Sequence, residues 1–360
     1  PISLRRLFHF IIPGKTIMTR QSHNRILLTG PTGSVGYEVL KILSRVHGFR
    51  IRILDQDKKS VRRILSSFTN IEKVYGQLND KAIVNQACKE VDAVIHLGAL
   101  IPPRADKETM QAWQTNVQGT HNGIEAMQRH NPGGSIIYAS SISVYGDRVK
   151  NPWIRVSDPL LPSKGDYYAE TKIEAENLLR ESGLKWTIFR VSAVMGSQTK
   201  MSSLFFHMPL DTSLEIVTAK DAGRAFVKAL DYLPELNHKI YNLSGGPDYR
   251  ILYLDFLKKV FAIKGLKRPD FPREAFANQN FHCGYYSDGS DLQEIIRFQK
   301  DNLADYYNIL EQQQNKLSFS LIQFLSPVIK KILLLKSDPL KAFRQGSGIH
   351  FKRYFNIIEK

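Results

Sequence analysis

The stretch Leu28-Thr29-Gly30-Pro31-Thr32-Gly33-Ser34-Val35-Gly36 decides the fold of this 360-residue chain. Its three evenly spaced glycines lie between an apolar run (25–29) that predicts a buried strand and a segment (35–46) with helical periodicity. Gly30 permits a tight turn, Gly33 lets backbone amides approach a pyrophosphate, and Gly36 lets helix and strand pack closely. The stretch therefore predicts a dinucleotide-binding loop, with candidate contacts from Gly30, Thr32, Gly33, Ser34, Val35 and Gly36.

Strand-like and helix-like segments alternate downstream of this loop. Further strands are predicted at 50–54, 72–75, 91–97, 135–139, 186–190 and 239–243. Helices are predicted at 58–68, from Asp80 onward, and at 107–130, 167–182 and 220–230. This alternation predicts an α/β fold with a Rossmann-type, doubly wound parallel sheet.

The chain is expected to divide into four parts. Residues 1–24 form a basic N-terminal extension, and residues 25–246 form the NAD(P)-binding domain. Residues 247–310 form a small C-terminal substrate-binding cap, to which 196–212 are also expected to belong. Residues 311–360 form a helical tail rich in basic and apolar side chains.

The net charge of +16 is concentrated at the two ends of the chain. Residues 1–25 carry five basic and no acidic side chains, and residues 316–360 carry nine basic and two acidic ones. About +4 remains for everything between, which argues against a nucleic-acid partner. The only cysteines, Cys88 and Cys283, make neither a disulfide framework nor a metal motif, so we expect no metal and a reducing, cytoplasmic setting.

Two apolar segments bear on membrane contact. Residues 7–12 are too short to span a bilayer and no small-residue cleavage site follows them, so no secretory signal is expected; Met18 is a candidate first residue. Residues 317–335 are largely apolar but are interrupted by Pro327 and by Lys330-Lys331. The 316–360 tail either lies on the inner, anionic face of a membrane or forms helices packed on the body, and we favour the packed helices.

The end of the second strand bears on the choice of cofactor. Asp55 closes this predicted strand, where a carboxylate can accept hydrogen bonds from the adenosine ribose and repel a 2′-phosphate. This favours NAD. The basic residues of the next helix could instead hold the phosphate of NADP, which therefore stays open: Lys58, Lys59, Arg62 and Arg63.

A serine pair, a tyrosine and a lysine suggest carbonyl/alcohol redox chemistry. Tyr168 and Lys172 are four residues apart on a predicted helix and share one face. A nearby ammonium lowers the pKa of a phenol, so the tyrosine could exchange a proton with an alcohol oxygen while hydride moves to or from nicotinamide. Ser141 or Ser140, at the end of the fifth strand, would hold the same oxygen.

With these motifs, the chain resembles the extended short-chain dehydrogenase/reductase superfamily, in its NAD-dependent epimerase/dehydratase branch, over roughly residues 25–310. Four further segments carry the resemblance: His96-Leu-Gly-Ala99, Thr115-Asn-Val-Gln-Gly-Thr120, Val217-Thr-Ala-Lys-Asp221 and Tyr241-Asn-Leu-Ser-Gly-Gly246.

The resemblance implies roles for individual residues. Ser141, Tyr168 and Lys172 would be the catalytic trio, Lys172 would also bind the nicotinamide ribose, and Asn116 would order the active-site backbone. Residues expected to line the cofactor are Leu97, Gly98, Ala99, Gln77, Leu78 and Val191. The superfamily's usual homodimer, formed through a bundle that includes the Tyr168 helix, is expected here.

The chain also departs from the family pattern. Gln77 stands where aspartate is usual, and Gly98 where alanine is usual. Ile142-Ser143 replace the Asp-Glu pair of sugar-nucleotide 4,6-dehydratases, which argues against a dehydratase. The stretch between Gly196 and Asp221 is shorter than in nucleotide-sugar enzymes, and its compact apolar segment 201–209 implies a substrate smaller or more apolar than a sugar nucleotide, with His207 as a candidate contact.

Three functions follow from these patterns. The leading hypothesis is an NAD(P)-dependent oxidoreductase or epimerase that acts on a secondary alcohol or ketone of a small molecule, such as a sugar derivative. The second is a membrane-associated dehydrogenase/reductase of a lipid or steroid-like alcohol. The third is a non-catalytic protein that senses NAD(H).

Overall fold

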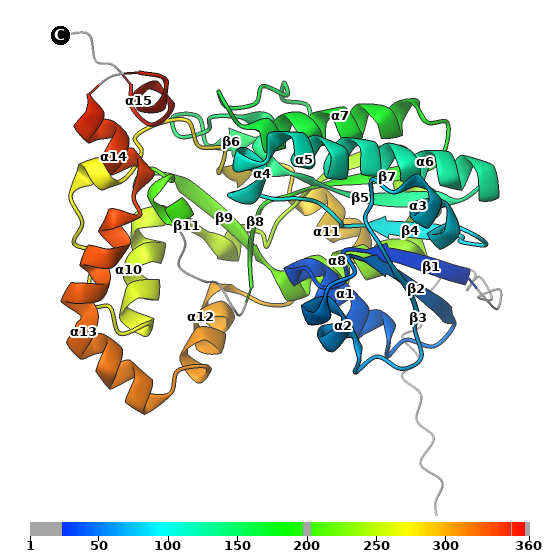
Figure 1. Cartoon of the computed structure of the whole chain (residues 1–360), viewed down its shortest axis with the longest axis horizontal. Helices are drawn as coiled ribbons and strands as arrows, with labels where there is room; N and C mark the ends of the chain where they lie inside the picture. Colours follow the sequence, from blue (N-terminus) through cyan, green and yellow to red (C-terminus); the bar gives the residue numbers. More distant parts are fainter. Residues whose placement is uncertain (1–23, 197–202, 347, 357–360) are drawn as a thin grey trace, which may run out of the picture.

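The computed structural model describes residues 24–196, 203–346 and 348–356 (Figure 1). The expected N-terminal extension therefore lies outside the described residues, apart from its last residue, and so does the start of the 201–209 segment.

Seven parallel strands form the central sheet, in the order β10-β7-β5-β4-β1-β2-β3. They are β1 (Asn24–Thr29), β2 (Phe49–Asp55), β3 (Glu72–Tyr75), β4 (Ala93–His96), β5 (Ser135–Ser141), β7 (Lys185–Val191) and β10 (Lys239–Leu243). All seven coincide with the predicted strands. The strand order reverses between β1 and β4, the place where doubly wound sheets leave a crevice at the carboxyl ends of the strands.

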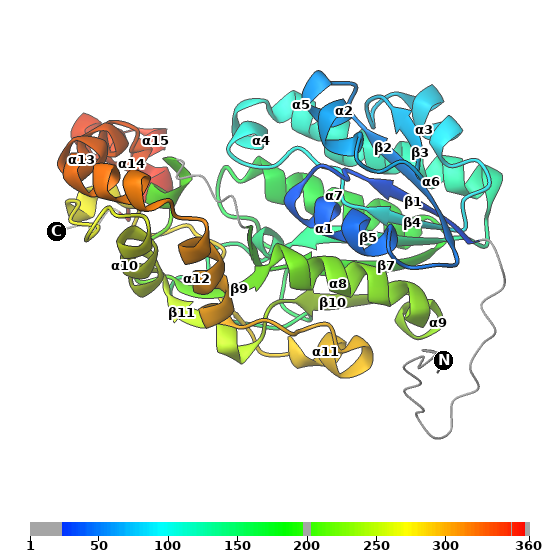
Figure 2. The ribbon, with the colours of Figure 1, turned by 90° about the horizontal axis from the view of Figure 1, so that it is seen from below.

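Helices cover both faces of the sheet (Figure 2). One layer contains α1 (Ser34–Leu43), α2 (Lys59–Leu65), α8 (Ala219–Ala229), α9 (Leu233–Leu236) and α11 (Ser290–Ile296). The other contains α3 (Lys81–Ala87), α6 (Gly119–His130) and α7 (Tyr167–Glu181).

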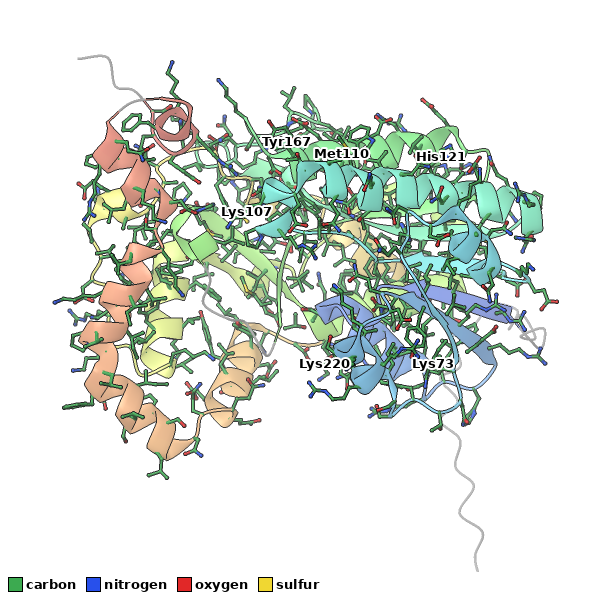
Figure 3. The ribbon with its side chains drawn as sticks, viewed as in Figure 1. Lys73, Lys107, Met110, His121, Tyr167 and Lys220 are labelled. Atoms are coloured by element: carbon green, nitrogen blue, oxygen red, sulfur yellow. The ribbon has the colours of Figure 1, made fainter. Side chains whose placement is uncertain are left out.

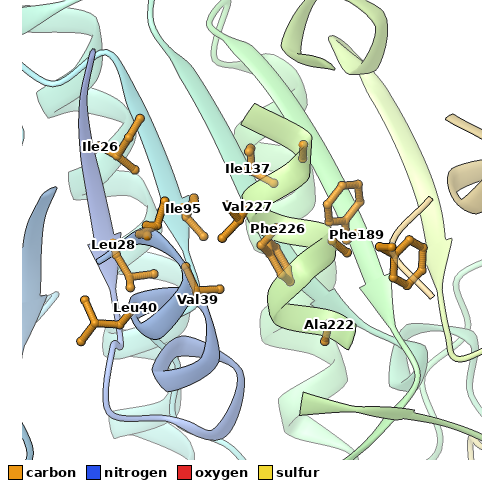
Figure 4. Packing of buried hydrophobic residues seen from close by; sticks show 14 of the residues in the cluster. Ile26, Leu28, Val39, Leu40, Ile95, Ile137, Phe189, Ala222, Phe226 and Val227 are labelled. Carbon is orange, nitrogen blue, oxygen red and sulfur yellow. The ribbon is translucent and has the colours of Figure 1, made fainter. Parts of the chain in front are cut away.

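The first layer packs tightly against β1 and its neighbours (Figure 4). Val39 and Leu40 of α1 and Phe226 of α8 are fully buried against Leu28 and Phe189 of the sheet. Burial of each such side chain stabilises the fold by about 1.5–3 kcal/mol. The predicted Rossmann-type fold is therefore confirmed. The apolar side chains of the predicted strands and helices are the ones that fill its core.

The predicted 107–130 helix is interrupted. It consists of α4 (Arg104–Lys107), α5 (Thr109–Trp113), a π-helical turn (Gln114–Gln118) and α6. Such wide turns are frequent at functional sites, and this one carries Asn116, which is almost completely buried.

A second unit is built largely from the C-terminal half of the chain. Its three-stranded sheet has the order β11-β9-β8, with β8 (Ala193–Met195), β9 (Ser213–Thr218) and β11 (Arg250–Leu252). Beside it lie α10 (Tyr253–Ile263) and α12 (Leu303–Gln312), and a two-stranded sheet pairs β6 (Trp153–Ile154) with β12 (Tyr285–Tyr286). Four of these five strands have only two or three residues, too few for a readable alternation, and the six-residue β9 was not predicted either. We call this unit the cap.

The tail is helical, as predicted. Its helices α13 (Lys316–Leu335), α14 (Asp338–Gln345) and α15 (Ile349–Tyr354) lie on the outer side of the cap (Figures 1 and 2). Leu333 and Leu340 share one apolar cluster with Phe256 and Phe261 of α10. The tail and the cap therefore have a common core.

Candidate active site

The glycine-rich loop connects β1 to α1 at the strand-order reversal. Gly30 has a φ of +67°, and a Cβ there would lie 2.8 Å from Gly98 Cα. A Cβ on Gly36 would lie 2.1 Å from the carbonyl oxygen of Gly30. At Gly33 the nearest atom to such a Cβ is that same oxygen, at 3.4 Å. Gly30 and Gly36 are therefore needed by the fold itself, whereas Gly33 leaves open space in front of the loop.

A cavity of about 260 Å³ opens beside this loop. Most predicted cofactor contacts line it: Gly30, Thr32, Gly33, Asp55, Gln77, Leu78, Leu97, Gly98 and Ala99. Its wall also includes residues that the sequence analysis did not single out: Leu54, Gln56, Gly76, Leu100 and Thr115. Ser34, Val35 and Gly36 belong to the first turn of α1 and do not line the cavity. Val191 is 8% exposed and lies in the core of the sheet rather than at this cavity.

Asp55 links the end of β2 to the glycine-rich loop. Its Oδ2 accepts hydrogen bonds from the backbone N (3.1 Å) and the hydroxyl (2.7 Å) of Thr32, and its Oδ1 accepts one from Gln56 N at 2.7 Å. A carboxylate held in this way at the cavity wall repels a 2′-phosphate and can accept from a ribose diol.

One of the basic residues nearby is already engaged. Arg62 donates from Nε to Asp57 Oδ1 at 2.6 Å, and its guanidinium lies 4.1 Å from the centroid of the Tyr75 ring. The hydrogen bond from Arg62 lowers the pKa of Asp57. Because its guanidinium is paired with Asp57, Arg62 is less available to bind the 2′-phosphate of NADP, which favours NAD.

A buried chain of hydrogen bonds joins the ends of β1 and β4. Thr29 Oγ1 contacts His96 Nδ1 at 2.8 Å and accepts from the backbone N of Leu97 and Gly98, while His96 Nε2 contacts Thr120 Oγ1 at 3.1 Å. Burial lowers the pKa of His96 to about 3, with a smaller effect from the charge of Lys172. His96 is therefore neutral and holds the cavity wall in place.

Asn116 orders the next part of that wall. Its Oδ1 accepts from Leu100 N at 2.7 Å, and its Nδ2 donates to Leu100 O and to Thr171 Oγ1, each at 3.0 Å. Its amide thus ties the segment after β4 to α7.

The two serines at the end of β5 point to different partners. Ser140 is buried and donates to the carboxylate of Glu176. Ser141 is only partly buried, and its Oγ accepts from the backbone N (3.2 Å) and hydroxyl (3.0 Å) of Ser143. It also lies within hydrogen-bonding reach of the Tyr168 hydroxyl. Of the two serines, Ser140 is therefore the one held by a carboxylate, and Ser141 is the one close to Tyr168.

Tyr168 and Lys172 share one face of α7, as the spacing predicts, but their contact is indirect. Lys172 Nζ lies 5.7 Å from the centroid of the Tyr168 ring and donates to Ala139 O at 2.7 Å and to the Tyr138 hydroxyl at 3.1 Å. Burial lowers the pKa of Lys172 to about 7, against an opposing effect of Glu176.

The pKa of Tyr168 differs in direction from the expectation. It is raised, first by burial and then by the charge of Asp166, while the hydrogen bond with Ser141 acts in the opposite sense. The expected lowering by Lys172 is not seen, because the tyrosine is largely enclosed and the ammonium is directed to the end of β5.

A buried ion pair behind these residues escaped the sequence analysis. Arg190 Nη2 and Glu176 Oε2 are 2.7 Å apart, and the two side chains are 3% and 1% exposed. Arg190 Nη1 also donates to the Tyr145 hydroxyl at 2.9 Å. Burial by itself would lower the pKa of Arg190, but the hydrogen bond and charge of Glu176 raise it. The pair clamps α7 to β7 one helical turn beyond Lys172, and only the packing of the helix on the strand reveals it.

A larger cavity, of about 430 Å³, lies between Tyr168 and the cap. Much of its wall is apolar and comes from the cap: Met195, Leu204, Phe205, Met208, Phe256, Leu257, Val260 and Phe261. The polar part of the wall includes Asp106, Lys164, Asp166, His207, His282 and Arg353.

His207 lines this cavity, where the sequence analysis placed a candidate contact. Its Nε2 lies 3.2 Å from Asp338 Oδ2 at the start of α14. Burial lowers the pKa of His207, and the hydrogen bond with Asp338 acts in the opposite direction. Arg353 of α15 reaches the same cavity and lies 3.4 Å from Asp106. The tail thus contributes side chains to the wall, a role that its composition did not indicate.

The described residues gather no group of three or more histidine, cysteine or acidic side chains that could hold a metal ion. Both cysteines are buried and free, and burial raises the pKa of each thiol to about 12. Among the side chains that line the larger cavity, the hydroxyl of Tyr168 stands beside acidic and basic groups that include Asp166, His207 and Arg353.

Comparison with known proteins agrees with this geometry. The profile of the NAD dependent epimerase/dehydratase family matches residues 26–244, more than half of the chain. The N-acetyl-alpha-D-glucosaminyl-diphospho-ditrans,octacis-undecaprenol 4-epimerase of Escherichia coli O157:H7 is 29% identical over 186 residues, 49% of this chain and 51% of that protein. The uronate dehydrogenase of Pseudomonas syringae pv. tomato is 28% identical over 240 residues, 66% of this chain and 79% of that protein.

Solved structures show the same fold. UDP-glucuronic acid 4-epimerase from Bacillus cereus, crystallised with UDP-glucuronic acid and NAD, matches with a TM-score of 0.64 and 18% sequence identity. The match covers 81% of this chain and 100% of that chain.

Proposed function

Because the chain belongs to the NAD-dependent epimerase/dehydratase family of the extended short-chain dehydrogenases/reductases, we propose that it oxidises a secondary alcohol of a sugar derivative with NAD. The product is either the ketone or, after hydride returns to the opposite face, the epimer. The observation that carries the proposal is the position of Tyr168, which lines the 430 Å³ cavity and lies within hydrogen-bonding reach of Ser141.

Each member of the trio has a distinct task in this reaction. Ser141 holds the substrate oxygen by a hydrogen bond, and Tyr168 takes the hydroxyl proton as general base. Lys172, whose ammonium lies 5.7 Å from the centroid of the Tyr168 ring, would favour the phenolate while the lysine is protonated, and in the reaction this effect must offset the burial that raises the pKa of Tyr168. Bound NAD supplies the hydride acceptor. For epimerisation, the ketone turns over in the cavity, hydride returns to its opposite face, and Tyr168 returns the proton to its oxygen.

The cofactor is proposed to lie along the smaller cavity, beside the glycine-rich loop. The pyrophosphate would meet the amides of Thr32, Gly33, Ser34 and Val35 at the start of α1, where the helix N-terminus favours an anion. Gln77 and Leu78 would border the adenine, and Leu97, Gly98 and Ala99 the middle of the cofactor. Asn116 would hold the wall beside the nicotinamide end, and Lys172 would reach the nicotinamide ribose. Val191 supports this end from the core, since its side chain does not line the cavity.

A substrate panel tests the proposal. Purified protein is incubated with NAD and with UDP-hexoses, UDP-uronic acids and free uronic acids, the classes named for its relatives. NADH absorbance reports net oxidation, and chromatography of the sugar reports epimerisation. The proposal is supported if the protein turns over any compound of the panel and if this turnover is lost when Tyr168 is replaced by Phe. Tight NADH binding without turnover of any member would favour the non-catalytic sensor instead.

A second candidate substrate class follows from the apolar wall of the larger cavity. Eight apolar cap side chains border it, which suits a sugar or alcohol that carries a lipid group. The same panel therefore includes a polyprenyl-diphosphate-linked N-acetylhexosamine and a steroid alcohol. Turnover confined to these members would identify the lipid-linked function.

Asp55 is expected to set the preference for NAD over NADP. Asp55→Asn should weaken NADH binding about tenfold, because a charge-assisted hydrogen bond to the ribose is lost, and should weaken NADPH binding less. Fluorescence titration with both cofactors measures the ratio. Asp248→Asn is the matched control, because that exposed carboxylate lies just before β11 and lines neither cavity. Equal loss for both cofactors would contradict the role given to Asp55.

We also propose a homodimer through α5 and α7. Met110, Trp113 and Tyr167 are 70%, 46% and 48% exposed on these adjacent helices, and Met110 and Tyr167 lie along one edge of the molecule (Figure 3). Met110→Asp with Trp113→Asp should convert the dimer to a monomer in light scattering, because two charges would enter a desolvated interface. Ile64→Asp on α2 is the control. A wild-type monomer would exclude this dimer.

A further inference from the structure

Helix α13 exposes a continuous stripe of large apolar side chains. The stripe consists of Leu317, Leu321, Phe324, Leu325, Val328, Ile332 and Leu335, between 38% and 83% exposed. At about 100° per residue, these positions fall within one arc of roughly 100° around the helix. The helix forms the outer edge of the cap (Figure 1), so the stripe faces away from the rest of the fold.

The opposite face of α13 already has its partners. Ile322, Ile329 and Leu333 join the apolar cluster of the cap. Ser326 is fully buried and its Oγ donates to Leu266 O at 2.9 Å, and Lys330 pairs with Asp270. The stripe is therefore a second apolar face, additional to the one that the fold uses.

The length of α13 raises the question of whether it spans a membrane. Among the described residues, Leu317–Leu335 is a helix long and apolar enough to do so by length and composition alone. However, the contacts of Ser326 and Lys330, in the middle of the helix, hold it lengthwise along the cap. A helix fixed in this way can present its stripe to an interface while remaining parallel to it.

The charges around the stripe indicate which kind of partner binds it. Residues 312–337 contain no acidic residue, and the exposed Lys331 and Lys336 border the stripe on its two sides. On the next helix, α14, Phe343 is 44% exposed beside the exposed Arg344, and the neighbouring Lys341 is paired with Asp338. A second copy of the chain would bring like charges together, whereas anionic lipid headgroups would neutralise them.

We propose that the stripe of α13, with Phe343, docks on an anionic membrane surface, with α13 lying in the plane of the interface. The apolar side chains enter the boundary between headgroups and acyl chains, and the flanking lysines contact the headgroups. This docking does not depend on the reaction proposed above. It would place the cap, whose tail residue Arg353 lines the 430 Å³ cavity, next to the lipid.

Vesicle co-sedimentation of the full chain tests the docking. The protein should bind vesicles of phosphatidylcholine mixed with phosphatidylglycerol, bind phosphatidylcholine alone much more weakly, and be released by salt. Leu321→Ser with Phe324→Ser should lower the partition constant at least about tenfold, because two large apolar contacts are lost. Lys331→Gln with Lys336→Gln should remove most of the preference for the anionic lipid.

Ile64→Ser with Leu252→Ser is the matched control, because both side chains are exposed elsewhere on the molecule. All variants must bind NADH like the wild type, which shows that they are folded. Absence of vesicle binding by the wild type would overturn the proposal. So would a fall in oligomeric mass in the Leu321/Phe324 variant, which would assign the stripe to a second copy. Binding that survives both high salt and alkaline carbonate would indicate a spanning helix and would likewise overturn it.

Discussion

Tyr168→Phe should lower turnover by at least about 100-fold, which corresponds to about 2.7 kcal/mol of transition-state stabilisation. The substitution removes one hydroxyl from a largely enclosed ring, so the shape of the cavity wall and the packing of α7 remain. In the proposed reaction this hydroxyl exchanges the substrate proton, and it lies close to Ser141. The affinity for NADH should stay close to that of the wild type.

The measurement is a comparison of kcat and of NADH titration with the substrate found in the panel. Tyr167→Phe is the matched control: the neighbouring tyrosine is 48% exposed and does not line the cavity. It should leave turnover unchanged. A Tyr168→Phe enzyme with wild-type turnover would show that another group transfers the proton and would refute the proposed site.

Gly33→Val should abolish NADH binding while leaving the protein folded. The backbone of Gly33 has a φ of −69°, which any residue can adopt, and a Cβ there meets only the Gly30 oxygen at an ordinary 3.4 Å. The added side chain would instead occupy the space in front of the loop, where the pyrophosphate must reach the backbone amides. Fluorescence titration measures the lost binding, and thermal unfolding measures the retained stability.

Substitutions at two other glycines distinguish a loss of cofactor binding from a loss of stability. Gly36→Ala should destabilise the protein strongly, because its Cβ would lie 2.1 Å from a backbone oxygen that cannot move aside. Gly123→Ala on α6 should have little effect on either measurement, because nothing lies within 4 Å of the added carbon. Retention of NADH affinity by Gly33→Val would place the pyrophosphate elsewhere.

The predicted parts of the fold are those with local signatures. Most strands of the main sheet have an apolar run that is buried in the sheet, although the edge strand β3 buries only Val74. The helices that follow the strands have periodic apolar positions, so apart from the interrupted 107–130 helix both kinds of element appeared in the sequence near their observed bounds. The cap has no such signatures. Its strands β8 and β11 have three residues each, and they form a sheet with the six-residue β9 only by pairing between segments well separated in the chain.

In the candidate site, too, the features set by local sequence were predicted and those set by tertiary packing were not. The glycine-rich loop and the Tyr168–Lys172 spacing were readable because a turn and a helical turn are each set within a few residues. The expected pKa shift of Tyr168 was wrong in direction, because enclosure by the fold outweighs a lysine that is hydrogen-bonded to Ala139 and Tyr138. Burial is a property of the assembled molecule and not of the spacing.

The sequence by itself therefore determined the doubly wound sheet, the dinucleotide-binding loop and the hydroxyl–lysine pair, since each depends on short-range geometry and on the period of apolar residues. Only the tertiary structure showed that Ser140 and Ser141 have different partners, because Glu176 of α7 accepts the hydrogen bond of Ser140. It also showed that Arg353 of the tail lines the 430 Å³ cavity while α13 keeps an apolar face uncovered. These outcomes follow from contacts between residues far apart in the chain, and such contacts exist only once the core has packed.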